Sequence, residues 1–420
     1  MKYIAQILHN PKLAPWVCIG LSAIASGWLL LDPRSVFSTM LLIIAMLMTY
    51  LANANKWLKL ALAAAVLCAV VPVAGHTNLG LTFLFISIFL NSTLAMGLNL
   101  VVGFAGLLDL GYIAFFAGGA YMYAFFGSKQ AAAVITAHAS WFPFGGWWFW
   151  AALPVTVAFA ALLGIMLGLP VLRLRGDYLA IVTLGFGEII NVLARNLDHP
   201  INLTNGVNGI GNITSPVLFG WKLNKDIHFY FIGLILAVLT IIIMSRMERS
   251  RIGRAWAAMR EDDTAAQAMG LNLTRLKLLA FATGAAFAGA SGMLFAVKQQ
   301  FINPDSFTFL ESVGIIAMVI LGGLGNIPGA IMGAVTVTVI RLQILQRFSD
   351  WLQHTWHLPD AFDFVKYQPL EFGLILILVM LFRREGLLPS QGRSEDITAI
   401  EAAVDPPATG VGAPSVGGRP

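Results

Sequence analysis

The chain is poor in charged residues and in cysteine. Only 11% of its 420 residues are charged, whereas a soluble domain normally carries about a quarter. This shortage argues against a water-soluble fold, and a hydrophobic content of 58% favours a membrane protein. The two cysteines, Cys18 and Cys68, both lie inside apolar runs. They predict neither a disulfide framework nor a metal cluster.

The sequence also lacks the motifs that would allow it to hydrolyse ATP or hold a catalytic metal. The dipeptide Gly-Lys does not occur, which excludes the phosphate-binding loop Gly-x4-Gly-Lys-Ser/Thr. No His-Glu-x-x-His or Cys-x-x-Cys pair occurs either. The formal net charge of +5 bears first on membrane topology. We therefore expect no enzymatic chemistry, no bound cofactor or metal and no nucleic-acid partner.

Long apolar runs fill most of the chain. A spanning helix needs about 20 apolar residues; runs of this kind lie at 14–31, 36–54, 57–75, 80–102, 111–127, 147–172, 178–195, 229–245, 278–297, 310–345 and 368–382. The run at 310–345 is too long for one span and is interrupted at 321–329, where Pro328 and four glycines disfavour a helix. Residues 103–110 predict a second break. We expect an all-α polytopic membrane protein with ten to twelve transmembrane segments, some of them broken.

Basic residues favour one orientation in the membrane. Arginines and one lysine cluster between residues 246 and 277, and such clusters stay on the cytoplasmic side. If crossings alternate, both termini are cytoplasmic and the number of spans is even. The last 30 or so residues are rich in Pro, Gly, Ser and Ala and predict a disordered tail.

The stretch REDDTAAQAMG at 260–270 is unusual within so apolar a chain. We expect a short helix over about 252–269 that ends at a glycine. Acidic residues would weaken binding to lipid headgroups, and small residues permit close approach by a partner. The stretch therefore predicts a protein-docking site, whereas arginines 246–254 fit ordinary contact with membrane lipid. The residues assigned to docking are Arg260, Glu261, Asp262, Asp263, Thr264, Ala265, Ala266 and Gly270.

A second group of residues is a candidate transport pathway. Asp109 stands among glycines near a membrane boundary, and Glu188 lies well inside an apolar run. Intramembrane carboxylates are functional hypotheses by default, but Asp109 could instead cap a helix, and Glu188 could pair with Arg195. Small residues and interrupted helices let a substrate or another helix approach the backbone. The full candidate set is Asp109, Gly185, Gly187, Glu188, Gly322, Gly323 and Gly325.

Two resemblances add to this interpretation. Ala265-Ala266-x-x-x-Gly270 is similar to the cytoplasmic loop of ABC-transporter permeases that docks on the ATPase subunit, although Thr264 stands where that loop has glutamate. The stretches at 97–124, 173–196, 203–210 and 302–334 resemble branched-chain amino acid ABC permeases of the larger, LivM type. One departure is Asn205-Gly206-Val207, where the class often has Gly-Gly-Pro before Asn-Gly. The likeness divides the chain into an extension at 1–79 with about three spans, a permease core at 80–385 and a cytoplasmic tail at 386–420.

The resemblance implies a bacterial inner-membrane permease subunit that forms half of a pore for leucine, isoleucine or valine. It implies as partners a second, LivH-type permease subunit, two ATPase subunits that use the ATP, and a periplasmic amino-acid-binding protein. Two alternatives stay open. A permease for urea or another short amide would have nearly the same sequence features, and an ion-coupled secondary transporter would work without an ATPase.

Overall fold

The computed structural model describes residues 14–135 apart from Asn53, residues 141–356 apart from 172, 173 and 175, and scattered residues between 367 and 388. Within these residues, nine helices are long and apolar enough to cross a membrane, and two shorter apolar helices accompany them. The expected all-α polytopic fold is confirmed. The span expected at 368–382 falls mostly outside the described residues.

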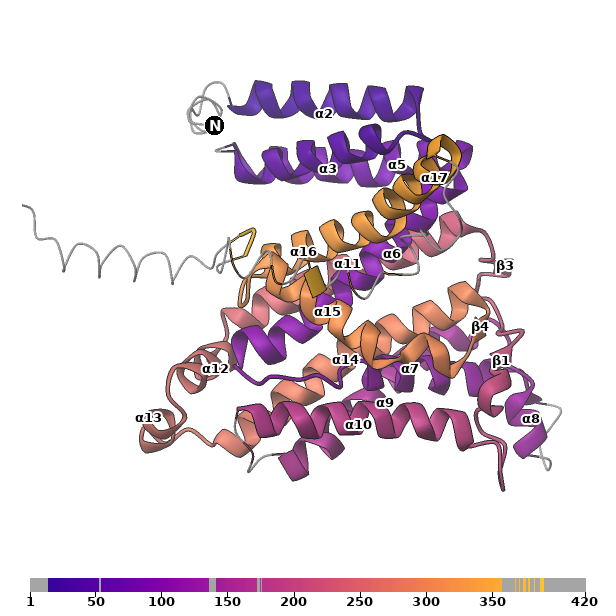
Figure 1. Cartoon of the computed structure of the whole chain (residues 1–420), viewed down its shortest axis with the longest axis vertical. Coiled ribbons are helices and arrows are strands. Elements are labelled where there is room, and N and C mark those ends of the chain that lie inside the picture. The colour runs from indigo at the N-terminus through magenta and orange to yellow at the C-terminus, as the bar shows by residue number, and fades with distance from the viewer. Residues whose placement is uncertain are drawn as a thin grey trace, which may run out of the picture.

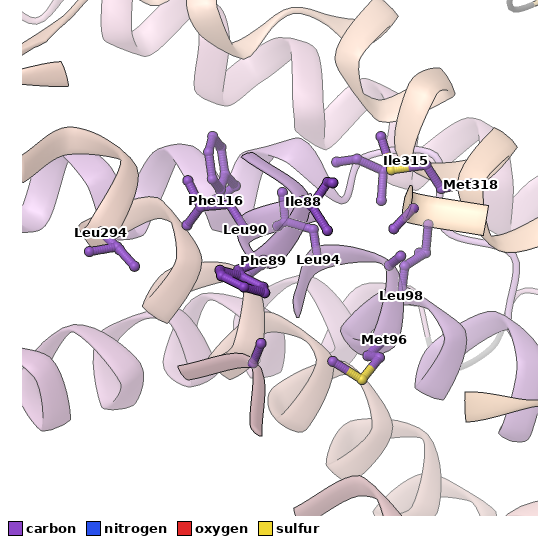
Figure 2. Packing of buried hydrophobic residues seen from close by; sticks show 14 of the residues in the cluster. Ile88, Phe89, Leu90, Leu94, Met96, Leu98, Phe116, Leu294, Ile315 and Met318 are labelled. Carbon is purple, nitrogen blue, oxygen red and sulfur yellow. The ribbon is translucent and has the colours of Figure 1, made fainter. Parts of the chain in front are cut away.

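The bundle is built around two largely buried helices. These are α6 (Leu79–Asn99) and α14 (Leu273–Gln299), against which α7 (Ile113–Gly127), α9 (Trp148–Val171), α11 (Asp226–Glu248), α15 (Phe309–Gly322) and α16 (Ile327–Val339) pack. Apolar side chains of α6, among them Leu90 and Leu94, meet Phe116, Leu294, Ile315 and Met318 from the surrounding helices (Figure 2). The outer helices keep exposed apolar faces, as helices that contact lipid do. One of these outer helices is α10 (Asp177–Asn196).

The N-terminal helices form a layer beside this bundle (Figure 1). They are α2 (Ala14–Leu31), α3 (Val36–Leu51), α4 (Lys56–Ala65), the π-helical segment η1 (Val66–Val70) and α5 (Val71–Thr77). A helix that continues α16, comprising the π-helical segment η6 (Ile340–Ile344) and α17 (Leu345–Trp356), connects this layer to the bundle. The Thr39 hydroxyl, for example, donates to the Gln343 side chain at 2.9 Å. The division into an extension, a core and a tail stays a prediction.

The break expected at 321–329 is present, and a non-helical connection between two helices occupies most of 103–110. After α6, the π-helical segment η2 (Leu100–Phe104) leads into a non-helical connection that reaches α7 at Ile113. The second break separates α15 from α16, with Gly323 at φ 116° and Gly325 at φ 78°. L-residues with a side chain rarely adopt such values, so glycine permits the chain to leave one helix and start the next. Gly322 packs directly against the backbone of Gly329, which closes the two helices onto each other.

The two ends of the bundle differ. One end carries α12 (Arg251–Glu261) and α13 (Asp263–Ala268), at the left of Figure 1. The opposite end, at the right, carries short elements: α8 (Gln130–Val134), η4 (Gly206–Asn208), β1 (Ile210–Gly211), β2 (Val217–Leu218), β3 (Trp221–Lys222), β4 (Phe301–Ile302) and η5 (Pro304–Phe307). Strand β1 pairs antiparallel with β4, and β2 pairs with β3. We call these the α12–α13 end and the strand end.

The expectation of one continuous helix over 252–269 is wrong. Asp262 has an extended backbone, with φ −153° and ψ 111°, and separates α12 from α13. Its side chain accepts hydrogen bonds from the backbone N–H groups of Thr264, at 2.7 Å, and Ala265, at 3.0 Å. Aspartate is among the strongest N-cap residues, so it starts a new helix here. The expected stop is confirmed, because α13 is followed by Gly270 at φ 86°.

Candidate functional site

The α12–α13 segment (residues 251–270) is anchored to the bundle by one aromatic side chain and one ion pair. Trp256 is fully buried, and its indole N–H donates to the Leu276 carbonyl at 2.9 Å. Lys277, which is also buried, pairs with Asp263 at 3.0 Å. Leu276 and Lys277 both lie on α14, so these contacts join the α12–α13 segment to one of the two central helices.

The residues assigned to docking do not all face outward. Glu261, Asp262, Thr264, Ala265 and Gly270 are exposed. Arg260 is exposed as well, although its Nη1 donates to the Gly103 carbonyl. Two others serve the fold: Asp263 is held by Lys277, and Ala266 is buried. The surface available to a partner is therefore smaller than the motif suggested. The docking role itself stays a prediction.

Arg260 joins the α12–α13 segment to both helix breaks. Its Nη1 donates to the carbonyl oxygen of Gly103 in the first break. The same atom lies beside Gly325 in the second break, where a Cβ would stand only 2.9 Å from it. From the sequence, Arg260 and Gly325 fell into separate groups, and the structure brings them into contact.

Asn99 completes this contact. It is fully buried near the end of α6, accepts the Gly325 N–H at 2.9 Å and donates to the Asn326 carbonyl at 3.2 Å. We call Asn99, Gly103, Arg260 and Gly325 the Arg260 junction. Asn99 was not predicted, although an asparagine four residues before a glycine in an apolar run was an available signal. The junction ties two interrupted helices to one surface helix through backbone groups.

A cavity of about 420 Å³ opens between the first break and the α12–α13 segment. Its lining includes Gly106 and Leu108 on one side and Arg260, Glu261 and Asp262 on the other. Glu261 and Asp262 therefore line a cavity beside the Arg260 junction.

The first break is also packed against α10. Gly111 lies so close to this helix that a Cβ there would collide with the Thr183 carbonyl oxygen, and a Cβ on Gly187 would lie 3.1 Å from the Gly111 Cα. The Thr183 hydroxyl accepts the Leu110 N–H at 3.0 Å. Gly187 therefore does permit a close approach, as the sequence suggested. Gly185 has open space beside its Cα, because no described atom lies within 4 Å of the place where a Cβ would stand.

Asp109 is fully buried within this break. Its Oδ1 accepts the Gly111 N–H at 2.9 Å, and its Oδ2 has no hydrogen-bond partner among the described residues. It is not the N-cap of α7, a position held by Tyr112 without a side-chain bond. A half-satisfied buried carboxylate is costly, and the proposed place of Asp109 in a pathway stays a prediction.

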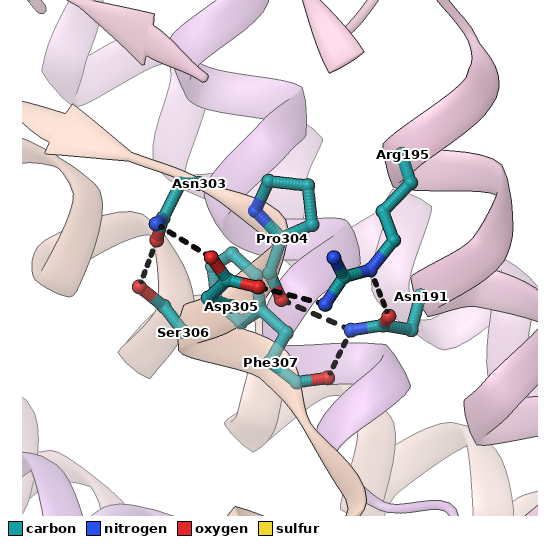
Figure 3. Close-up of polar contacts among 7 residues, drawn as sticks. All are labelled: Asn191, Arg195, Asn303, Pro304, Asp305, Ser306 and Phe307. Carbon is teal, nitrogen blue, oxygen red and sulfur yellow. Dashed lines mark hydrogen bonds and ion pairs between the residues drawn. The ribbon is translucent and has the colours of Figure 1, made fainter. Parts of the chain in front are cut away.

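Glu188 does not pair with Arg195. Arg195 binds Asp305 at 2.7 Å and the Asn191 side chain at 2.9 Å (Figure 3). Glu188 is exposed on the outer side of α10 and makes no hydrogen bond or ion pair with a described residue. The alternative that Glu188 pairs with Arg195 is therefore wrong. The proposed place of Glu188 in a transport pathway stays a prediction.

A second cavity, of about 330 Å³, lies between α6, α15 and the α16–η6 helix. Leu90, Leu94 and Ile315 contribute apolar walls, and Glu311 and Arg341 contribute opposite charges. These two side chains form a bidentate pair, with distances of 2.8 and 2.9 Å. The pair was not predicted, although both charges interrupt one long apolar run. Arg341 lies in a π-helical segment, a distortion frequent at functional sites.

The apolar spans, the surface helices and the cavities beside them are those of a polytopic membrane protein. Residues 80–382 match the family described as "Branched-chain amino acid transport system / permease component". The chain belongs to this family and is a transport permease.

Named relatives support this assignment. The chain is 40% identical over 319 residues to the "High-affinity branched-chain amino acid transport system permease protein LivM" of Salmonella typhimurium, covering 70% of this chain and 67% of the relative. It is 39% identical to LivM of Escherichia coli over the same length. It is also 29% identical over 211 residues to LivH of Salmonella typhimurium, covering 47% of this chain and 61% of that protein. No solved structure matches the chain.

Proposed function

We propose that this chain forms half of the translocation pore of an ABC importer for leucine, isoleucine and valine in a bacterial inner membrane. Separate ATPase subunits supply the work, a second permease subunit completes the pore, and a periplasmic protein delivers the amino acid. The chain itself catalyses no covalent step. Similarity to both LivM and LivH supports an importer with two related permease subunits.

The Arg260 junction carries the mechanistic part of this proposal. An ATPase docked on the exposed residues of the α12–α13 segment would displace α12, and Arg260 would pass that displacement to Gly103 and Gly325. Both glycines lie where helices are interrupted, so small shifts there change how the helices meet. Access alternates because the ATPase subunits favour one arrangement over the other in each nucleotide state.

Docking is tested by combining Glu261→Lys with Gly270→Pro. Proline cannot adopt the positive φ of residue 270, and the lysine reverses an exposed charge. We expect the ATPase subunit to co-purify at less than about a tenth of the wild-type yield, since each tenfold change corresponds to about 1.4 kcal/mol of binding energy. Membrane insertion should be unchanged. Co-purification at full yield would show that the ATPase docks elsewhere.

Gly220→Pro is the matched control for this experiment. Gly220 also has a positive φ, of 87°, but lies in the turn between β2 and β3 at the strand end. The same backbone disturbance far from the α12–α13 segment should leave ATPase co-purification intact. A similar loss in both variants would attribute the effect to general misfolding.

Transport itself is tested in proteoliposomes that contain both permease subunits and the ATPase subunits, with the binding protein outside. We expect ATP-dependent accumulation of labelled leucine and none of labelled urea. Urea accumulation would favour the short-amide alternative. Concentrative uptake by this chain alone, abolished when the proton gradient collapses, would instead establish an ion-coupled transporter.

A further inference from the structure

Helix α10 has an outer side that nothing in the described chain covers. Figure 1 shows the helix at the edge of the bundle. Residues three and four apart share a side of a helix, and the exposed positions, with the half-buried Gly185 among them, follow this spacing. We call them the α10 outer face: Tyr178, Ile181, Val182, Gly185, Glu188, Ile189 and Val192.

Glu188 makes the α10 outer face unlike a surface that contacts only lipid. Glu311, in the first turn of α15, and Arg341 compensate each other's charge. Glu188 lies near the middle of its span and makes no hydrogen bond or ion pair with a described residue. A lone carboxylate directed at lipid near the middle of a span costs at least about 2.5 kcal/mol, so lipid is a poor occupant of this face.

The helix cannot rotate to bury Glu188 within its own chain. On the opposite side, Gly187 is wedged against Gly111, and the Thr183 hydroxyl holds the Leu110 N–H. Toward the strand end, Asn191 donates to the carbonyls of Pro304 and Phe307 at 3.0 and 2.9 Å (Figure 3). These contacts fix which side of α10 faces the bundle. Glu188 therefore points away from it.

We propose that the α10 outer face is the surface on which the second permease subunit sits, and that Glu188 faces a hydrated passage enclosed between the two subunits. This inference rests on the proposed function for the identity of the occupant. Two related subunits tend to meet through equivalent surfaces about an approximate twofold axis. Gly185, with open space beside it, allows the close approach that packed membrane helices use.

The placement also links the passage to the ATPase. The first helix break contacts Arg260 at Gly103 and contacts α10 at Gly111. A displacement of α12 therefore reaches α10 through one non-helical connection. Gly111 contacts the side of α10 that faces the bundle, and Glu188 lies on the other side of this helix.

A photocrosslinking experiment tests the occupant. Benzoylphenylalanine replaces Ile181 or Val192 on α10, and Ile235 or Val238 on α11 as matched controls that are also exposed and apolar. In the co-expressed complex, irradiation should join the α10 positions to the second permease subunit, whereas the α11 positions should give lipid adducts only. Crosslinks from α11 and none from α10 would overturn the inference, as would crosslinks from α10 to a second copy of this chain.

These outcomes are separable from failure of the proposed function. A complex that assembles and transports leucine but crosslinks only through α11 overturns the α10 assignment alone. Wild-type subunits that do not assemble at all overturn the proposed function and, with it, this inference.

Hydration of the passage is tested with cysteine. In a chain whose Cys18 and Cys68 are replaced by alanine, Glu188→Cys and Ile235→Cys are each treated with a hydrophilic methanethiosulfonate reagent in the assembled complex. The thiolate is the reactive form, and it forms readily only in water. We expect Glu188→Cys to react at least about tenfold faster than Ile235→Cys. Equally slow reaction at both positions would refute a hydrated passage beside residue 188.

Discussion

The two ends of the bundle are held together by different kinds of contact. At the strand end, side chains pair with side chains or with loop carbonyls, as Arg195 does with Asp305 and Asn191 with Pro304. At the α12–α13 end, one arginine reaches backbone groups of two interrupted helices, and an open cavity lies beside it. The α12–α13 end also has a side-chain pair, Lys277 with Asp263, and it differs from the strand end in that its arginine contacts the interrupted helices. This difference is what the proposed coupling to an ATPase at the α12–α13 end requires.

The largest effect on stability is expected where backbone meets backbone. Gly111→Val places a side chain into the Thr183 carbonyl, and overpacking of this kind costs about 1–3 kcal/mol or more. The purified chain should lose several degrees in Tm or fail to accumulate. Gly185→Ala, where no atom stands within 4 Å, should leave Tm unchanged. Equal Tm values for the wild type and both variants would show that the break is not packed on α10.

The Glu311–Arg341 pair should show the next largest effect. Arg341→Met leaves a carboxylate without its partner in a membrane-spanning helix. Breaking a fully buried pair costs about 3–5 kcal/mol. Because about a third of each side chain is exposed, we expect about 1–2 kcal/mol. The double variant with Glu311→Gln should recover most of the loss, measured as a double-mutant cycle on unfolding in detergent. Additive losses would mean that the pair is not coupled.

The smallest effect is expected at the cap of α13. Asp262→Ala removes the acceptor for two backbone N–H groups, and losing an N-cap costs about 1 kcal/mol. Amide hydrogen exchange in residues 263–268 should become faster, with little change elsewhere. Asp262→Asn keeps an acceptor and should exchange nearly as slowly as wild type. Unchanged exchange in Asp262→Ala would contradict the assigned cap.

The helices and their interruptions were predictable because lipid exposure makes apolar runs long and glycines conspicuous. Pro328 and the neighbouring glycines were enough to predict the break at 321–329. The division at Asp262 was missed because an acidic residue in a charged stretch is equally compatible with a helix surface and with a cap. Only the backbone geometry distinguishes these two roles.

The candidate site was predictable in parts but not in its connections. Arg260 and Gly325 were each selected for separate reasons, and nothing in one sequence shows that the intervening residues bring them together. The alternative pairing of Glu188 with Arg195 is wrong for a related reason. Glu188 is close to Arg195 in the sequence, but the carboxylate that pairs with Arg195 in the structure is Asp305. Contacts between distant helices depend on packing, which local patterns do not encode.

Coupling depends most on Arg260, and the direct measurement compares ATP hydrolysis with leucine uptake in the same proteoliposomes. In Arg260→Ala, each bound ATPase should hydrolyse ATP at the wild-type rate, while uptake per ATP falls at least about tenfold, as for loss of about 1.4 kcal/mol of coupling. Arg254→Ala lies on the same helix, and among the described residues the Arg254 side chain donates only to the nearby Arg249 carbonyl. This variant should couple as wild type. Unchanged uptake per ATP in Arg260→Ala would contradict the account.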